Sequence, residues 1–538
     1  MCFEKLGVMV DCSRNSVMTV SALKKLIDVL SGMGYNTIQL YTEDTYEVEG
    51  EPYFGYLRGR YSRAELKEVD AYAKEKGMEL FPCIQTLAHL KKIFRWHPYW
   101  GINDTADILL AENPRTEELI ENIFRSLSQS FTSRRVNIGM DEAHLLGLGK
   151  YLDLHGYSNR VDIMVKHLKK VAGIAEKYGF RCMMWGDMFF RLAFGGNYYV
   201  DEVQEIPAEV LEKLPDNVDL IYWDYYSTDK ARYKTMIKGH QALNKNTLFA
   251  GGGWTWTGLT PNNRYALAAT KAAFAACKEE GVKEAFITLW GDDGGSCSPF
   301  SVLPTLFTAA KLAEGVEDEE LIKEEFEKRF GIPFDTFLYA DLPNMLYRDQ
   351  PLESCNPAKY LLYNDTLLGM FDSFVDVGMG EAYKAHAEKL AEAERYEEWS
   401  FVFRPLRLLC EALYYKTDLG VKTRDLYRQE DRTGIGELVG NAYMPLIDRL
   451  TVFYEVFREY WHGLFKPHGF EVTDYRIGGL IFRLKHVAEK LTAYSQGKIG
   501  DIPELDEEIL DYLGGVSEKE KKAISYNSFN TTVTVNSL

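Results

Sequence analysis

Two adjacent carboxylic acids, Asp141 and Glu142, follow the short apolar run 136–140. A buried strand has no structural need to end in two acids. Neighbouring carboxyl groups in different surroundings can hold different protonation states, which acid–base catalysis requires. An arbitrary Asp-Glu pair is more often a solvated loop. The position of this pair in the fold therefore decides between the two interpretations.

The first part of the chain repeats one pattern eight times. Short apolar runs alternate with segments of helical periodicity, among them a short predicted helix near 207–213. Within most of these runs, apolar and polar residues do not alternate, as expected for strands buried on both faces of a parallel sheet. Eight such units favour an α/β fold of the (β/α)8 TIM-barrel type over residues 1–315. An open doubly wound sheet is the alternative, but no glycine-rich phosphate loop follows the first strand. The other seven predicted strands are Leu6–Val10, Thr37–Tyr41, Glu79–Gln85, Arg181–Trp185, Asp219–Tyr222, Thr247–Gly251 and Glu284–Thr288.

The remaining part, residues 316–538, has a different pattern. Strand-like runs largely vanish, and helical periodicity predicts a mostly α-helical C-terminal domain. The sequence leaves open whether this domain completes the site, forms a homodimer interface or braces the barrel. The clearest predicted helices are Glu319–Phe330, Gly380–Glu397, Phe403–Lys416, Leu446–Tyr460 and Ile477–Tyr494.

Acids and aromatic side chains collect where the predicted strands end, and barrel enzymes carry their catalytic side chains there. Five of the nine tryptophans follow strands five to eight. Any one of them could be core packing. Together with acids they favour a sugar ligand, because C–H faces stack on indole and carboxylates accept hydrogen bonds from hydroxyl groups. The residues at these ends are Asp11, Arg14, Glu43, Asp44, His89, Asp141, Glu142, Trp185, Asp187, Trp223, Asp224, Tyr225, Trp254, Trp256, Trp290 and Asp292.

Composition narrows the partners. A net charge of −18 argues against nucleic acid or an anionic membrane as the main partner, and no apolar run approaches membrane-spanning length. The eight cysteines are scattered without metal-ligand or redox spacing, so we expect reduced thiols, no metal and no cofactor. The start of the chain lacks the pattern of a signal peptide, and we expect a cytoplasmic protein.

The sequence Gly-Met-Asp-Glu-Ala at 139–143 resembles the signature of glycoside hydrolase family 20, the β-N-acetylhexosaminidases. The resemblance covers roughly residues 3–315. It implies a (β/α)8 barrel that hydrolyses terminal β-linked GlcNAc or GalNAc from a small-molecule or oligosaccharide substrate. Further motifs similar to those of the family follow in the expected order at Gly7–Arg14, Tyr41–Asp44, Ala88–His89 and Trp290–Asp292.

The resemblance also implies a substrate-assisted retaining mechanism, in which the substrate's own acetamido oxygen attacks the anomeric carbon. Asp141 would orient the acetamido group, and Glu142 would act as general acid and then as general base. The resemblance further implies that the acetamido methyl is enclosed by Trp185, Trp254 or Trp256, and Trp290, and that its oxygen accepts a hydrogen bond from Tyr225 or Tyr222. It implies that Asp292 binds the C4 and C6 hydroxyls and that His89, with Glu43 or Asp44, lies beside the acid. Trp223 is also in the predicted substrate-binding set. An equally weighted alternative is that His89 is a structural histidine of the loop whose hydrogen bonds are made within the protein.

Three departures indicate a divergent branch of the family. Leu6 stands where the family usually has an arginine that holds the sugar, and Arg14, Lys5 or Glu4 are the candidate substitutes. The first strand begins within ten residues of the start, where an α+β domain commonly precedes the barrel. Glu43 stands where aspartate is usual.

Two other functions remain open at this point. One is a barrel glycosidase with two carboxylates, in which a distant acid such as Asp187 or Asp224 is the nucleophile. The other is a non-catalytic protein that binds amino sugars.

Overall fold

A computed structural model describes residues 2–199, 215, 217–243, 246–292, 294–346 and 356–515, and the chain in it divides into two compact units. The first unit contains the chain up to Gly253, together with Ala266–Trp290 and Thr305–Asp318. The second contains Trp254–Tyr265, Gly291–Pro304 and the chain from Glu319 onward. The boundary predicted at 315/316 remains a prediction.

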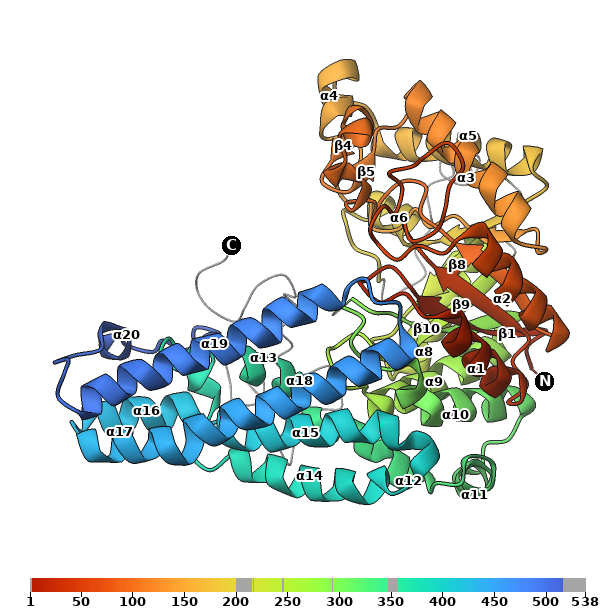
Figure 1. The fold of residues 1–538 in the computed structure, drawn as a ribbon. Helices are drawn as coiled ribbons and strands as arrows, with labels where there is room; N and C mark the ends of the chain where they lie inside the picture. Colours follow the sequence, from red (N-terminus) through yellow and green to blue (C-terminus); the bar gives the residue numbers. More distant parts are fainter. Residues whose placement is uncertain are drawn as a thin grey trace. The chain divides into compact units, whose positions relative to one another are not determined.

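The core of the first unit is a closed barrel of eight parallel strands, which confirms the predicted (β/α)8 fold (Figure 1). Going round the barrel, each strand pairs with its neighbour in the order β1-β10-β9-β8-β7-β6-β3-β2, and β2 pairs again with β1. All strands point the same way, so the loops that follow them gather at one end. The strands are β1 (Lys5–Asp11), β2 (Thr37–Tyr41), β3 (Glu79–Cys83), β6 (Arg135–Asn137), β7 (Arg181–Trp185), β8 (Val218–Trp223), β9 (Thr247–Gly252) and β10 (Glu284–Leu289).

The fourth strand of the barrel is shorter than its apolar run suggested. Strand β6 ends at Asn137, because Gly139 and Met140 take the left-handed backbone conformation and leave the sheet. A small antiparallel hairpin, β4 (Asn103–Thr105) and β5 (Ile108–Leu109), lies in the loop after β3 and was not predicted. The short helix expected near 207–213 lies outside the described residues.

Helices cover the barrel, and their starts follow the sequence signals. Ser62 and Glu65 form a reciprocal capping box at the start of α2, and Asn113 caps α3 ahead of Pro114. Helices α1, α2, α3 and α5 pack side by side around the barrel (Figure 1). The helices of this part of the chain are α1 (Val20–Ser31), α2 (Arg63–Glu75), α3 (Pro114–Ser130), α4 (Lys150–His155), α5 (Arg160–Lys177), α6 (Asp187–Ala193), α8 (Lys230–Leu243), α9 (Asn263–Glu279) and α10 (Leu303–Glu314).

The second unit is built mainly of helices, as predicted. Its long helices α14, α15, α18 and α19 pack side by side in succession (Figure 1). Helix α15 buries Phe403, Leu409 and Leu413 completely, and each such side chain contributes about 1.5–3 kcal/mol by leaving water. Its helices are α11 (Glu319–Phe330), α12 (Phe334–Phe337), α13 (Pro357–Tyr363), α14 (Gly380–Glu394), α15 (Ser400–Lys416), α16 (Leu419–Arg428), α17 (Arg432–Leu438), α18 (Met444–Leu464), α19 (Phe470–Ser495) and α20 (Pro503–Asp506).

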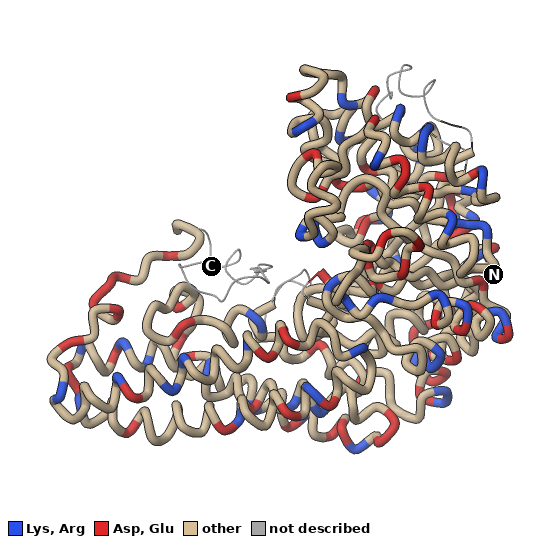
Figure 2. The backbone as a smooth tube through the Cα atoms, turned by 45° about the horizontal axis from the view of Figure 1, so that its top comes forward, with Lys and Arg blue, Asp and Glu red and all other residues tan. Residues whose placement is uncertain are grey.

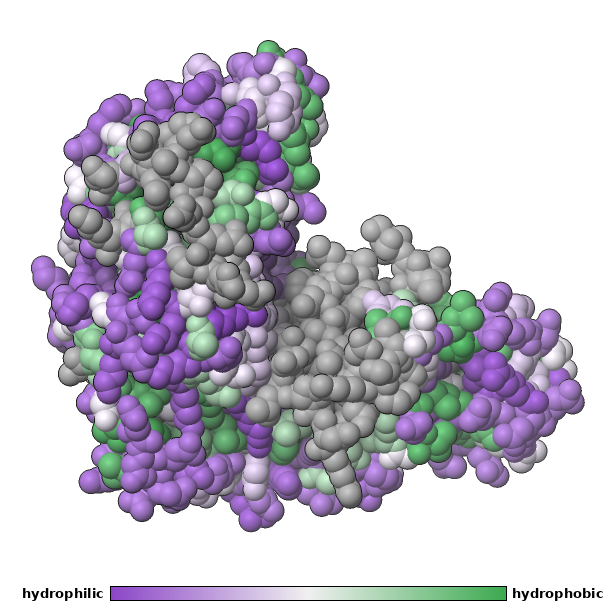
Figure 3. All heavy atoms as spheres, turned by 180° about the vertical axis from the view of Figure 1, so that it is seen from behind, coloured by the Kyte–Doolittle hydropathy of each residue, from purple (hydrophilic) through white to green (hydrophobic). Residues whose placement is uncertain are grey.

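Both units have mixed, polar surfaces. Basic and acidic residues alternate along the helices (Figure 2), and the face seen in Figure 3 is largely hydrophilic with scattered apolar residues. Among the described residues, no helix combines the length and the apolar character needed to cross a membrane.

One buried carboxylate, Glu51, anchors the long loop between β2 and α2. It accepts hydrogen bonds of 2.7 and 2.5 Å from Arg115, 2.9 Å from Asn122 and 3.0 Å from the Tyr99 hydroxyl. Burial opposes its ionisation, but the hydrogen bonds from Arg115 and Asn122 prevail and lower the pKa of Glu51. This loop also carries residues discussed below, so its anchoring positions part of the site.

We expect Glu51→Ala to lower the free energy of unfolding of the barrel unit by about 2–3 kcal/mol. The substitution leaves the Arg115 guanidinium and the Asn122 amide without their acceptor. Because the folded pKa is lowered, the contribution is present above the unfolded pKa and is lost as the pH falls through the folded value. Urea denaturation at several pH values measures it. Glu49→Ala, at an exposed acid of the same loop, is the control, and an equal loss in both variants would contradict the anchoring role.

Candidate active site

Asp141 lies buried at the end of the barrel where the carboxyl ends of the strands meet, with two polar partners. Gln85 donates to its Oδ1 at 2.7 Å, and the His89 Nε2 lies 3.3 Å from its Oδ2. Burial opposes the charged form, but the neighbouring His89 and Gln85 prevail and lower the pKa of Asp141. Burial likewise disfavours charge on His89, yet the Asp141 carboxylate raises the pKa of His89 to about 10. Asp141 is therefore an ionised acid paired with an imidazolium.

The backbone before Asp141 is shaped by Gln85. Its side-chain oxygen accepts from the Met140 N–H at 3.1 Å. A Cβ on Gly139 would lie 2.2 Å from that same oxygen, and the φ of Gly139 is +73°. Only glycine fits both the conformation and the space at this position. The segment leaving β6 is thus locked to the end of β3, and this lock sets the direction of Asp141.

Glu142 differs from its neighbour in exposure. Its side chain is 40% exposed, and its Oε2 lies 3.8 Å from the His89 Nε2. On its other side, Arg191 brings Nη2 to 3.6 Å from Oε1. The Glu142 backbone N–H donates to Asp187 at 3.2 Å. One acid of the pair is therefore enclosed and ionised, while the side chain of the other is partly exposed.

Asp187 and Arg191, four residues apart on α6, form an ion pair with Arg191 Nε 3.0 Å from Asp187 Oδ2. The Asp187 side chain is 0% exposed. Burial, followed by the charge of Asp141, raises the pKa of Asp187 to about 7, although Arg191 opposes the shift. Asp187 therefore holds the Glu142 backbone, and Arg191 in turn holds Asp187.

We expect Asp187→Asn to raise the melting temperature, and to do so more at pH 7.5 than at pH 5.5. The folded pKa of Asp187 is above its unfolded value of 3.8, so the wild-type carboxyl is progressively more costly to bury as the pH rises towards 7. Asparagine keeps an acceptor for Arg191 and does not ionise. The advantage should grow by about 2–4 °C between these pH values and level off above. A pH-independent difference between Asp187→Asn and the wild type would contradict the assignment, and Asp153→Asn, at an exposed position, is the control variant.

The end of β2 contributes a second buried acid. Glu43 accepts from the Tyr41 hydroxyl at 3.2 Å, and the Arg14 Nε lies 3.4 Å from the same oxygen. Burial raises the pKa of Glu43, although Arg14 acts against the shift. The Tyr41 hydroxyl also accepts from Gln85 at 3.1 Å, so the Glu43 group and the Asp141 group belong to one connected network.

Aromatic rings from three strand ends surround this network. Trp290 packs edge-on against Tyr41 with ring centres 4.7 Å apart, and lies 5.8 Å from Trp185. Its indole N–H donates to the Tyr225 hydroxyl at 3.0 Å, and Tyr225 stacks on Trp223. Four of the predicted aromatic residues are therefore together in the first unit.

Two other candidate residues at the end of β8, Tyr222 and Asp224, contact each other and not Trp290. Tyr222 donates to Asp224 at 2.9 Å and packs against His240, so Tyr225 rather than Tyr222 joins Trp290. Asp224 also accepts from the Tyr226 N–H at 2.9 Å, and its side chain is fully buried.

Three predicted residues belong to the second unit: Trp254, Trp256 and Asp292. The indoles of Trp254 and Trp256 stack with centres 4.6 Å apart, and Tyr265 packs edge-on against Trp254. Their roles at the sugar remain predictions.

Four non-glycine residues of the network have left-handed backbone conformations. The φ angles are +45° at Glu43, +56° at His89, +69° at Met140 and +50° at Glu142. Such conformations cost of order 1 kcal/mol or more each, and they persist where the surroundings impose them. They cluster here at the strand ends that carry the acids.

Two of the proposed arginine substitutes are wrong. Lys5 and Glu4 lie at the opposite end of β1, where Lys5 pairs with Glu79 at 2.7 Å and Glu4 with Lys283 at 3.6 Å. Of the three, Arg14 is the one that lies at the end of the barrel that carries the acid pair, beside Glu43. Leu6 is a buried core residue.

Sequence reasoning did not include Gln85 and Arg191 among the candidate site residues, although Gln85 contacts Asp141 and Arg191 contacts Glu142. Gln85 was visible as a polar residue at the end of an apolar strand, the position that barrel chemistry uses. Arg191 stands four residues after Asp187, the spacing of an ion pair on one helix face.

A parallel barrel with paired acids and aromatic side chains at the ends of its strands is typical of glycoside hydrolases. Residues 3–250 match the glycosyl hydrolase family 20 catalytic domain, and residues 335–525 match the glycoside hydrolase 20C C-terminal domain. The chain belongs to glycoside hydrolase family 20.

Relatives in the family are distant. Hexosaminidase D of Bos taurus is 23% identical over 249 residues, which cover 44% of this chain and 66% of that protein. Beta-hexosaminidase 1 of Coccidioides posadasii is 22% identical over 315 residues, covering 47% of this chain and 50% of the relative. The chain thus spans about half to two thirds of the length of these relatives. Among solved structures, a family 20 exo-β-N-acetylglucosaminidase from Vibrio harveyi in complex with N-acetylglucosamine is similar with a TM-score of 0.47 and 16% identity, covering 63% of this chain and 58% of that one.

Proposed function

We propose that the protein is an exo-β-N-acetylhexosaminidase that releases terminal β-linked GlcNAc or GalNAc by substrate-assisted retaining catalysis. The observation that carries this proposal is the contrast within the acid pair, an enclosed and ionised Asp141 beside an accessible Glu142.

Asp141 suits a role at the acetamido group. Gln85 and His89 hold its side chain in one orientation, and its negative charge offsets the positive charge that develops as the acetamido oxygen attacks the anomeric carbon. The ring formed by this attack is an oxazolinium ion, and the bond to the leaving oxygen breaks as it forms.

Glu142 suits proton transfer. It gives its proton to the leaving oxygen in the first step and takes one from water in the second, when water opens the oxazolinium ring with net retention. His89 and Arg191 flank its two oxygens and limit its orientation. Trp185, Trp290 and Tyr225 are proposed to line the acetamido pocket.

The two-carboxylate alternative would need an exposed nucleophile. Asp187 and Asp224 both have side chains with 0% exposure and are held by hydrogen bonds to neighbouring groups. A nucleophile must reach the anomeric carbon, so this burial favours the substrate's own acetamido group.

The decisive experiment compares aryl β-glycosides with and without a 2-acetamido group. Cleavage confined to the 2-acetamido sugars, with strong inhibition by a thiazoline analogue of the cyclised intermediate, supports the proposal. Equal cleavage of β-glucosides and indifference to the thiazoline would favour the two-carboxylate mechanism. Binding of GlcNAc without any turnover would favour a binding protein.

We also propose a cytoplasmic location. A homodimer remains a prediction.

A further inference from the structure

Two exposed tyrosine rings and one half-buried tryptophan ring meet on the loops that follow β2 and β3. Tyr53 and Tyr56, 42% and 43% exposed, come from the first loop, and Trp96 comes from the second. The ring centres lie 6.0 Å apart for Tyr53 and Tyr56, 5.8 Å for Tyr53 and Trp96, and 5.3 Å for Tyr56 and Trp96. We call these three residues the aromatic platform. Single exposed apolar residues are ordinary, but a contiguous group marks a binding surface.

The platform is built on a rigid loop. Phe54, between the two tyrosines, is fully buried and packs against Tyr46 at 5.3 Å. Gly55 has a φ of +64°, and a Cβ there would lie 2.0 Å from the Asp44 carbonyl oxygen. Arg60 donates to the Pro52 carbonyl at 3.1 Å. Together with the Glu51 anchor, these contacts fix the loop before any ligand arrives, which reduces the entropy lost on binding.

The same two loops hold residues of the acid network. The first begins with Glu43 and Asp44, and Arg58 joins its far end back to Asp44 Oδ1 at 3.2 Å. The second carries His89, seven residues before Trp96. Between them on this loop, Lys92 lies within electrostatic reach of Glu43 and Asp44. The platform is therefore at the same end of the barrel as Asp141 and Glu142, on the loops adjoining them.

We propose that Tyr53, Tyr56 and Trp96 bind the aglycone of the substrate, namely the sugar residues next to the terminal N-acetylhexosamine. Pyranose rings present apolar C–H faces that stack on aromatic side chains, and their hydroxyl groups remain in water. An exo-acting enzyme encloses the terminal sugar, so the rest of the glycan leaves across the rim of the site. This inference rests on the proposed function and adds its substrate class, an oligosaccharide rather than a short glycoside.

The test measures kcat/KM for β-linked GlcNAc oligomers of two to four sugars and for an aryl β-GlcNAc with one small aglycone ring. For the wild type we expect kcat/KM to rise with oligomer length. The double variant Tyr53→Ala/Tyr56→Ala should lose about tenfold on the tetrasaccharide, mostly through KM, and change less than about threefold on the aryl substrate. The double variant Tyr53→Phe/Tyr56→Phe keeps the rings and should retain wild-type values.

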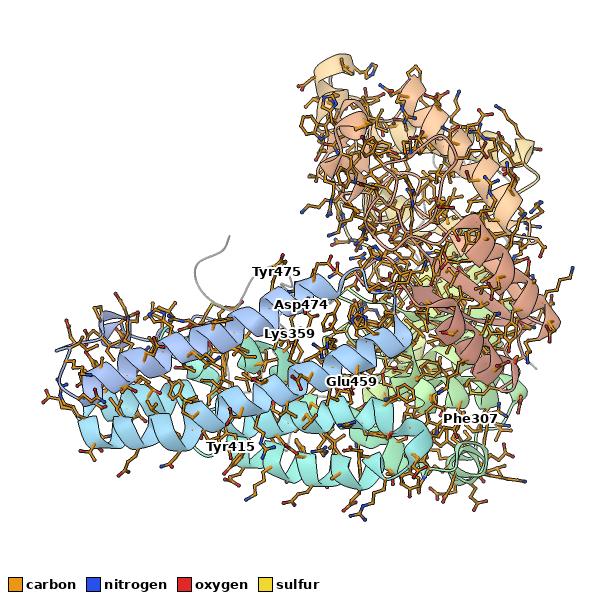
Figure 4. The ribbon with its side chains drawn as sticks, viewed as in Figure 1. Phe307, Lys359, Tyr415, Glu459, Asp474 and Tyr475 are labelled. Atoms are coloured by element: carbon orange, nitrogen blue, oxygen red, sulfur yellow. The ribbon has the colours of Figure 1, made fainter. Side chains whose placement is uncertain are left out.

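A matched control is Tyr475→Ala, which removes a tyrosine that is 79% exposed on α19 (Figure 4) and should change neither substrate. If the double alanine variant folds poorly by its melting temperature, calorimetric binding of the tetrasaccharide to Glu142→Gln, with and without the single change Tyr53→Ala, replaces it, and the alanine change should weaken this binding. Equal losses on both substrates, or a wild type indifferent to length, would overturn the platform. A wild type that cleaves no 2-acetamido sugar would instead overturn the proposed function.

Discussion

Glu142→Gln will lower kcat/KM for an aryl β-GlcNAc with a poor leaving group by about 10²–10⁴-fold, because the leaving oxygen then departs without a proton. The side chain is 40% exposed and glutamine has nearly the same shape, so the fold should not change. The loss should be much smaller for a dinitrophenyl glycoside, whose leaving group needs no proton. Steady-state kinetics over a series of leaving groups measures the effect.

The control for this variant is Glu118→Gln, at an exposed acid of α3, which should leave the kinetics unchanged. Turnover by Glu142→Gln close to the wild-type rate would remove Glu142 from the acid role. A loss independent of the leaving group would assign it to binding or to the second step.

Asp141→Asn will lower kcat by about 10²–10³-fold, with the loss concentrated on 2-acetamido substrates. Asparagine keeps the size of the side chain but has no charge to offset the oxazolinium ion. Inhibition by a thiazoline analogue should weaken in parallel, since the analogue resembles the cyclised state.

A second measurement separates this role from a structural one. The carboxylate of Asp141 is what raises the pKa of His89, so an NMR titration of the variant should show the pKa of His89 falling from about 10 towards 6.5. A variant with the lowered His89 pKa but unchanged kcat and thiazoline affinity would contradict a catalytic role for Asp141.

The barrel could be predicted because each strand has its own local sequence pattern, a short apolar run. Apolar runs such as Thr37–Tyr41 and Arg181–Trp185 appear in the structure with the predicted ends. The capping residues Ser62 and Asn113 predicted where helices α2 and α3 begin. Both signals act over a few residues and need no knowledge of the rest of the chain.

The network around the acids could be predicted only in part. Composition at strand ends located Asp141, Trp185 and Trp290, but the bridge from Tyr41 through Gln85 to Asp141 joins residues 44 and 56 positions apart. No local pattern contains such a contact. The left-handed turn at Met140 that shortens β6 was missed for the same reason, since the Gln85 oxygen that accepts its N–H comes from the loop after β3.

The unusual backbone at Glu43, His89, Met140 and Glu142 has a consequence for engineering. Glycine adopts this backbone conformation at a lower energetic cost, so a library screened for thermostability alone would readily select glycine at these positions. At three of the four, the same change deletes a carboxylate or an imidazole of the network. Directed evolution of a hardier variant therefore has to screen for turnover in every round, or it will enrich well-folded proteins with an impaired site.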